Sequence, residues 1–247
     1  MKQYTIPSSF ESLPVEIFLY PAKQINSPTL ILLKGLYGFH DPHSSVSWDA
    51  DILRVCDEKY NIICINTARK KNNVGDTAIK ETFNGKTFKQ ECDDILCVHQ
   101  YLFKNKILHS EHGFHIVANS FGGTTLLGTP EVLSKASSVI MIGSGCGRNP
   151  TTTKPLLQTL FNEEKLLASL RLYTGVFGFV RGSDDVVVPK ESQDKIIKNA
   201  VSASVCMTYT IHGAQHDLSP GLNMSTVDRT RVLLSMINQA ILLSANA

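Results

Sequence analysis

The stretch ANSFGG, residues 118–123, directly follows an apolar run typical of a buried strand and directly precedes a helical pattern. Small residues, Ala118 and Gly122, lie two positions before and two positions after Ser120. A sharp turn from a strand into a helix needs small residues there, because neighbouring backbone approaches closely and the serine hydroxyl is exposed above the sheet. The pattern predicts a nucleophilic serine, although serine between small residues also occurs in ordinary strand–helix loops.

Outward from this stretch, short apolar runs alternate with helical patterns. The runs are rich in β-branched residues and nearly continuous, which is typical of parallel strands covered on both faces. The predicted strands are Val15–Tyr20, Thr29–Leu33, Asn61–Asn66, Phe114–Ala118, Ser138–Ile142, Gly175–Val180 and Val205–Ile211. The predicted helices are Trp48–Lys59, Thr87–Lys104, Gly122–Lys135, Lys190–Ala203 and Val227–Leu243. This alternation predicts an α/β fold with a parallel sheet.

Length and composition set further limits. The chain has 247 residues with 24 basic and 22 acidic side chains, a net charge of +2 that gives no reason to expect nucleic acid or an anionic membrane as partner. No repeat divides the sequence, so we expect one domain over residues 1–247, with a short lid-like insertion at about 146–172. The apolar runs are too short for a membrane span or a signal-peptide core, which predicts a soluble cytoplasmic protein.

Other residue patterns favour structural roles. The six cysteines form no C-x-x-C pair, and most of them are expected to be small buried hydrophobic residues. The histidines show no zinc-binding spacing, and we expect neither a metal nor a cofactor. The basic run Arg69-Lys70-Lys71 is typical of a solvated loop. Ser144, in the glycine-rich stretch 143–147, is expected to sit in an ordinary tight turn. A strand-to-helix turn like that at Ser120 needs a small residue two positions before the serine, and Ile142 occupies that position.

Two further candidate residues follow predicted strands downstream. Asp185 lies in the loop after the strand Gly175–Val180, and His216 lies in the loop after the last strand. Ser120, Asp185 and His216 therefore all lie just past the carboxyl ends of strands, where sites in open parallel sheets form. Asp184 and His212 are the alternatives for the acid and the base.

With these residues in place, the sequence resembles the α/β-hydrolase-fold serine hydrolases. The stretch LKGLYG, residues 33–38, is similar to the family's oxyanion loop, and INTAR, residues 65–69, stands where the family often shows Asp-x-Arg-Gly. Residues 88–96 resemble the helix that precedes the nucleophile strand, and a closing helix follows His216. The resemblance implies an α/β-hydrolase fold, with a mostly parallel central sheet, helices on both faces and a minimal lid.

The resemblance also implies a mechanism. Ser120 would be the nucleophile, His216 the base and Asp185 the acid, and the backbone N–H groups of Leu36 and Phe121 would form the oxyanion hole. Lys34 stands in place of the family's common histidine, Tyr37 in place of a glycine, and Ala118 in place of the first elbow glycine.

The substrate that the resemblance implies is a small-molecule carboxylic ester or thioester. Two alternatives stay open at this point. One is a non-catalytic relative that binds a ligand or a protein, and the other is an acyltransferase. The sequence does not indicate an oligomeric state.

Overall fold

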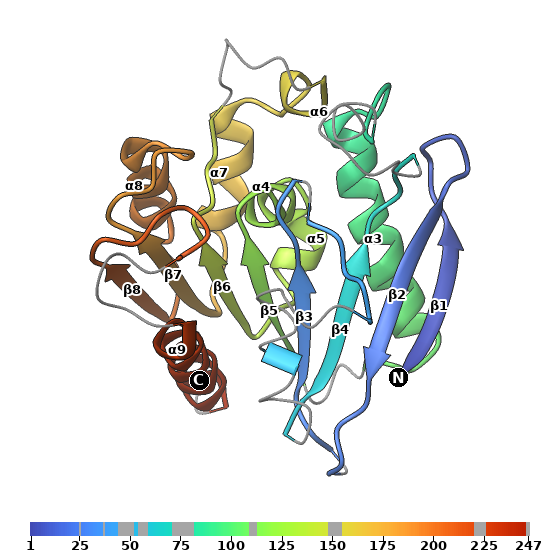
Figure 1. Cartoon of the computed structure of the whole chain (residues 1–247), viewed down its shortest axis with the longest axis horizontal. Helices are drawn as coiled ribbons and strands as arrows, with labels where there is room; N and C mark the ends of the chain where they lie inside the picture. Colours follow the sequence, from blue (N-terminus) through green and yellow to red (C-terminus); the bar gives the residue numbers. More distant parts are fainter. Residues whose placement is uncertain are drawn as a thin grey trace.

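A central β-sheet organises the molecule, in a computed structural model that describes residues 1–24, 26–36, 38–43, 52–53, 59–70, 82–108, 113–147, 155–219 and 226–245 (Figure 1). Within these residues the sheet has eight strands, in the spatial order β1-β2-β4-β3-β5-β6-β7-β8. Their bounds are β1 Lys2–Pro7, β2 Pro14–Tyr20, β3 Thr29–Leu33, β4 Asn61–Asn66, β5 Phe114–Asn119, β6 Ser138–Ile142, β7 Val176–Gly182 and β8 Val205–Ile211. Strands β3 to β8 pair in parallel, as predicted.

The amino-terminal edge of the sheet differs from the prediction. The strand β1 was not predicted, and it pairs antiparallel with β2, which itself pairs antiparallel with β4. Along β1 only Ile6 is buried, because an edge strand has little contact with the core. A strand of this kind lacks the continuous apolar run that marks β3 and β6, in which every residue is buried. The sheet is therefore mostly parallel, as the family resemblance implies.

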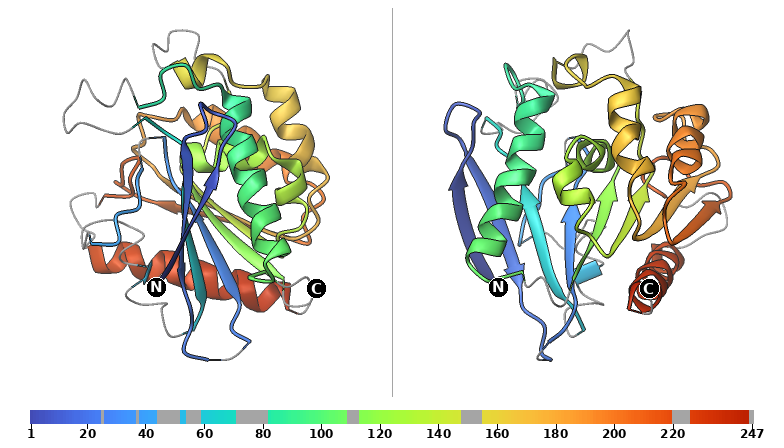
Figure 2. Two further views of the ribbon diagram at one scale, coloured as in Figure 1. Left: turned by 90° about the vertical axis from the view of Figure 1, so that its right-hand side faces the viewer. Right: turned by 180° about the vertical axis from the view of Figure 1, so that it is seen from behind.

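Helices cover both faces of the sheet (Figures 1 and 2). One face packs against α3 (Phe88–Lys104), α4 (Phe121–Leu127), α5 (Pro130–Leu133), α7 (Glu163–Arg171) and α8 (Lys190–Asn199), and α6 (Pro155–Gln158) precedes α7 in the chain. The other face packs against α9 (Thr226–Ser244) and Ile52. The predicted helix Trp48–Lys59 falls mostly outside the described residues. No helix in the described part of the chain is long and apolar enough to cross a bilayer.

The predicted helix Gly122–Lys135 is two helices in the structure, α4 and α5. The break falls at Thr129, whose backbone has φ −126° and ψ 68°, directly before Pro130. Proline disfavours the helical conformation in the residue before it and lacks an N–H for the helical hydrogen bond, so the first helix ends there.

The predicted insertion at 146–172 is described in part. Residues 148–154 lie outside the described residues. In α7, the side chains of Leu166, Leu167 and Leu170 are buried in the core beside α4. This helix therefore belongs to the layer that covers one face of the sheet, and the lid stays a prediction.

Candidate active site

Ser120 lies at the turn between β5 and α4 with a strained backbone, φ 50° and ψ −117°. Residues other than glycine rarely adopt positive φ, and such conformations persist where the surrounding structure enforces them. Here the Ser120 N–H donates to the carbonyl of Ile142 on β6 over 2.7 Å, which fixes the turn against the neighbouring strand. The turn leaves the Ser120 side chain half-buried at the carboxyl edge of the sheet.

The small residues around Ser120 are explained by close backbone contacts. A Cβ at Gly122 would lie 2.7 Å from the carbonyl oxygens of both Leu33 and Lys34, and one at Gly123 would lie 2.0 Å from Ser144 Oγ. Ala118, by contrast, is fully buried in β5, and its methyl group is accommodated. Gly122 therefore allows α4 to approach the end of β3, and Gly123 allows it to approach the segment after β6, while the position of Ala118 tolerates a methyl group.

We expect Gly122→Ala to lower the free energy of unfolding by about 1–3 kcal/mol, because the new methyl group overpacks against backbone atoms that have little room to move. Alanine would otherwise stabilise a helix by about 1 kcal/mol relative to glycine, so a net loss would show that the clash dominates. Denaturant unfolding measures the effect. Gly147→Ala is the control, since its Cβ would meet its nearest atom at an ordinary 3.6 Å. Equal stability of the two variants would contradict the prediction.

His216, in the loop after β8, lies within hydrogen-bonding distance of Ser120. Its Nε2 is 2.8 Å from Ser120 Oγ, and its Nδ1 is 2.8 Å from Asp185 Oδ2. A carboxylate accepts its hydrogen bond from Nδ1–H, which leaves Nε2 as the acceptor for the serine hydroxyl. The His216 side chain is 20% exposed and is therefore partly accessible to solvent.

Asp185 follows β7, and its carboxylate is held by the backbone of its own loop. Asp185 Oδ1 accepts the N–H groups of Val187 at 2.9 Å and Val188 at 3.0 Å. Burial by itself would raise the pKa of Asp185, but the hydrogen bonds from His216 and from the two backbone N–H groups outweigh burial and hold the pKa below its usual value. Asp185 is therefore ionised at neutral pH.

The two alternatives from the sequence are not part of this arrangement. Asp184 is exposed, and its Oδ1 accepts the hydroxyl of Ser183 at 2.7 Å instead of a histidine. His212 is exposed at the end of β8. The structure thus brings Ser120, His216 and Asp185 together and leaves Asp184 and His212 aside.

The two backbone groups expected in an oxyanion hole lie on loops beside Ser120. Phe121 is the first residue of α4, so its N–H has no carbonyl four residues earlier in the helix to receive it. Gly35, directly before Leu36, lies so close to the elbow that a Cβ on it would be 3.1 Å from Asn119 Oδ1 and 3.4 Å from Ser120 Cβ. The loop after β3 therefore reaches the serine, although Tyr37 lies outside the described residues.

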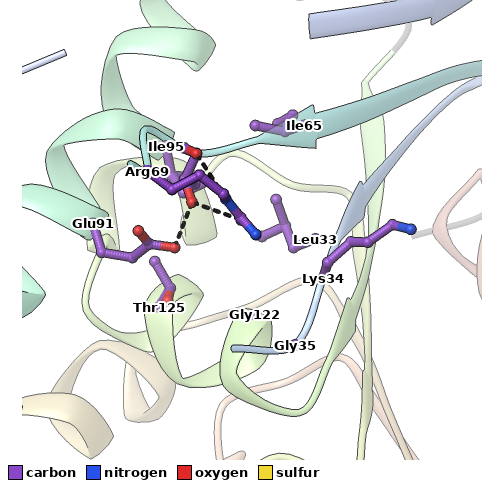
Figure 3. A pocket seen from close by; sticks show the side chains of 10 residues that line it. Leu33, Lys34, Gly35, Ile65, Arg69, Glu91, Ile95, Gly122 and Thr125 are labelled. Atoms are coloured by element: carbon purple, nitrogen blue, oxygen red, sulfur yellow. Dashed lines mark hydrogen bonds between the residues drawn. The ribbon is translucent and has the colours of Figure 1, made fainter. Parts of the chain in front are cut away.

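The interpretation of Arg69 as part of a solvated basic run is wrong. The Arg69 side chain is half-buried beside a small pocket (Figure 3). The side chain of Lys34 points away from the Arg69 guanidinium. Burial lowers the pKa of Arg69 despite nearby acidic residues. Its guanidinium donates to the carbonyl of Gly38 at 3.0 Å, in the loop that follows β3, and to the carbonyl of Thr67 at 3.2 Å. The pocket is lined by Leu33, Lys34, Gly35, Ile65, Thr67, Arg69, Glu91, Ile95, Gly122 and Thr125.

A buried ion cluster lies behind Arg69. Thr67 Oγ1 donates to Glu91 at 2.9 Å, and Glu91 also accepts a hydrogen bond from the fully buried Lys86. The Lys86 ammonium donates further to Asp94 and to the carbonyl of Ala68, each at 2.7 Å. Arg69 Nη2 donates to Thr67 Oγ1 at 3.4 Å and so joins a charged cluster that links the segment after β4 to α3, which gives the loop after β3 a rigid support.

We expect Arg69→Met to lower kcat by about 10–100-fold, because the carbonyl of Gly38 loses its donor and a small displacement of the loop moves the Leu36 N–H. Steady-state kinetics with a chromogenic ester measures the change. Arg171→Met is the matched control, since Arg171 pairs with Glu164 on the exposed side of α7. If Arg69→Met folds and keeps the wild-type kcat, the loop does not depend on this contact.

The other histidines and the cysteines for which contacts are seen have local structural roles. His40 is buried and contacts the Tyr20 hydroxyl at 2.7 Å, and His115 contacts the Ser138 hydroxyl at 2.9 Å. Among the cysteines, Cys64, Cys92 and Cys146 are buried, as expected, whereas Cys206 is exposed. The described residues contain no group of three or more histidine, cysteine or acidic side chains arranged to hold a metal ion.

Comparison with known proteins gives matches to solved structures. Neither protein-family models nor curated protein sequences match the chain. Est1E of Butyrivibrio proteoclasticus is 13% identical with a TM-score of 0.67, and the match covers 98% of this chain and 99% of Est1E. The esterase domain of a Rhodothermus marinus protein is 13% identical with a TM-score of 0.63, covering 99% and 96%. A protein from Agrobacterium tumefaciens assigned to the alpha/beta hydrolases is 12% identical with a TM-score of 0.60, covering 96% and 97%.

The chain has the α/β-hydrolase fold. The match extends over nearly the full length of each chain, and the mostly parallel sheet with helices on both faces agrees with it. Within this fold, Ser120 follows β5, Asp185 follows β7 and His216 follows β8. Sequence reasoning missed Gln193 on α8, whose amide also donates to Asp185, because nothing in the sequence distinguishes it from an exposed helical glutamine.

Proposed function

We propose that this α/β-hydrolase is a serine hydrolase that cleaves a carboxylic ester or thioester of a small substrate. The observation that carries the proposal is the unbroken chain of hydrogen bonds from Ser120 through His216 to Asp185, with both contacts of His216 at 2.8 Å. A serine is a weak nucleophile unless a base takes its proton, and this arrangement supplies the base and a carboxylate that orients it.

In the first step, Ser120 Oγ attacks the acyl carbonyl carbon and its proton moves to His216 Nε2. The carbonyl oxygen becomes an oxyanion, which the N–H groups of Phe121 and Leu36 stabilise. Asp185 stays ionised and stabilises the imidazolium that forms. The tetrahedral intermediate collapses, the bond to the leaving group breaks, and His216 returns its proton to the leaving alcohol or thiol. The product of this step is an acyl group on Ser120.

In the second step, water takes the place of the leaving group. His216 Nε2 accepts a proton from the water as its oxygen attacks the acyl-enzyme, and the same proton then returns to Ser120 Oγ as the carboxylic acid is released. The half-buried Ser120 and the 20% exposed side chain of His216 leave the reacting atoms accessible to water. Water is the most abundant acceptor around such a site, and we therefore propose hydrolysis before transfer of the acyl group to another acceptor.

An ester panel tests the substrate class. The panel holds p-nitrophenyl esters from acetate to decanoate, an alkyl thioester and an anilide of the preferred acyl group, and methyl ferulate, because one structure of Est1E contains bound ferulic acid. We expect turnover of the short-chain esters and thioester with little turnover of the anilide, whose leaving group is poorer. A folded protein that turns over none of these would contradict hydrolysis and favour a ligand-binding role. Product found only in the presence of an added alcohol would indicate an acyltransferase.

A further inference from the structure

Gln193 is a buried polar residue beside Asp185. It lies on α8 and is only 1% exposed. Its Nε2 donates to Asp185 Oδ2 at 2.9 Å and to the carbonyl of Val188 at 3.0 Å. The two contacts use both N–H bonds of the amide, so the side chain holds the carboxylate and the loop that carries it at the same time.

The orientation of the Gln193 amide is defined by these two acceptors. With its NH₂ group facing Asp185 and Val188, Gln193 Oε1 is buried without a hydrogen-bond partner among the described residues. The opposite orientation would place the amide oxygen against a carboxylate and a carbonyl, which repel it. A buried polar atom without a partner is unfavourable. Gln193 therefore leaves its oxygen unpaired while it donates both N–H bonds, one to the Asp185 carboxylate and one to the carbonyl of Val188 in the same loop.

The Gln193 amide completes the set of donors around Asp185. Oδ1 accepts the N–H groups of Val187 and Val188, and Oδ2 accepts His216 Nδ1–H together with Gln193 Nε2–H. Four hydrogen bonds prevent rotation of the carboxylate. Because Oδ2 is shared, the amide also reduces the negative charge available to stabilise a protonated His216.

We propose that Gln193 is a positioning residue that fixes Asp185 Oδ2 against His216 and sets the pH range in which His216 acts as a base. The proposal rests on the proposed serine hydrolase function. Gln193 does not touch the reacting atoms and acts only through Asp185.

The charged groups near the loop that carries Asp185 are the same in the wild type and in the Gln193 variants. Their contribution to the pH profile therefore cancels when the variants are compared with the wild type. Asp184 directly precedes Asp185 in the sequence, and Asp217 directly follows His216. On α8, Lys190 pairs with Asp194, and Asp194 also pairs with Arg181 from β7.

Gln193→Met removes both donors while keeping the length of the side chain. We expect kcat to fall about tenfold with KM nearly unchanged, because Asp185 Oδ2 is no longer held in place against His216 and this loss of position outweighs the stronger stabilisation of the imidazolium. The acid limb of the pH–rate profile is expected to move up by about half a pH unit, because Asp185 then stabilises protonated His216 more strongly. A purely structural role for Gln193 would not move this limb.

Gln193→Asn keeps an amide but shortens the side chain by one methylene group, so the amide no longer reaches both Asp185 and the carbonyl of Val188, and this variant carries the test if Gln193→Met does not fold. The acid limb is expected to move up in the same direction as in Gln193→Met. Gln100→Met, at an exposed position on α3, is the control for the chemical change and is expected to match the wild type. The rate constant of fluorophosphonate labelling is measured beside ester turnover, because this rate constant, unlike turnover, does not depend on the folded fraction.

Two results would overturn the proposal while the proposed function stands. One is a wild-type labelling rate and acid limb in both Gln193 variants. The other is a loss of thermal stability with an unchanged acid limb in the folded fraction, which would make Gln193 a structural residue only. If the wild-type protein is itself not labelled, the proposed function fails instead.

Discussion

Ser120→Ala is expected to lower kcat for ester hydrolysis by about 10⁶-fold, the loss seen when the nucleophile of a serine triad is removed. Ser120 Oγ is the atom that forms the bond to the substrate, and the same oxygen lies 2.8 Å from His216 Nε2. The free energy of unfolding is expected to stay within about 0.5 kcal/mol of wild type, because the side chain is half-buried and loses one hydrogen bond. Initial rates and thermal unfolding of the purified variant measure the two effects.

Ser144→Ala provides the matched control. Ser144 lies between two glycines next to Gly123, and its buried hydroxyl has no hydrogen-bond partner among the described residues. Its removal is expected to leave turnover nearly unchanged. A Ser120→Ala protein with wild-type turnover would remove Ser120 from the mechanism, and a Ser144→Ala protein without turnover would show that the loss is not specific to Ser120.

Asp185→Asn is expected to lower kcat by about 10⁴-fold, because an amide in place of the carboxylate favours the wrong tautomer of His216 and gives no charge to stabilise the imidazolium. The structure supports a large effect, since the Asp185 side chain is 2% exposed and lies 2.8 Å from His216 Nδ1. The folded state should survive, because the amide oxygen of the introduced asparagine can still accept the N–H groups of Val187 and Val188. Steady-state kinetics at a fixed pH measures the change.

Asp184→Asn makes the same chemical change one residue away. Asp184 is exposed and its carboxylate accepts the Ser183 hydroxyl, away from His216, so we expect the rate to change by less than about threefold. A larger loss in Asp184→Asn than in Asp185→Asn would mean that the loop after β7 presents the other carboxylate during turnover.

The sequence was sufficient to predict the central strands and the places of the candidate site residues. Strands β3 and β6 are continuous apolar runs, and Ser120 is flanked by small residues whose necessity is visible in the contacts of Gly122. The carboxyl ends of parallel strands meet at one edge of the sheet, so residues far apart in the chain could be predicted to meet.

Other features depend on tertiary contacts that local patterns do not show. The edge strand β1 buries only Ile6, which leaves no apolar run to read. The guanidinium of Arg69 donates to the carbonyls of Gly38 and Thr67 and is therefore half-buried. In the sequence Arg69 is the first of three consecutive basic residues, which is typical of a solvated loop. Gln193 contacts Asp185 only because α8 folds back beside the loop after β7.

Intact-mass measurement after exposure to a fluorophosphonate tests whether Ser120 is an activated nucleophile. Wild type, Ser120→Ala and Ser144→Ala are treated in parallel. We expect a single phosphonyl adduct on wild type and on Ser144→Ala, and no adduct on Ser120→Ala. A folded wild-type protein that forms no adduct, or an adduct that persists in Ser120→Ala, would exclude Ser120 as the nucleophile.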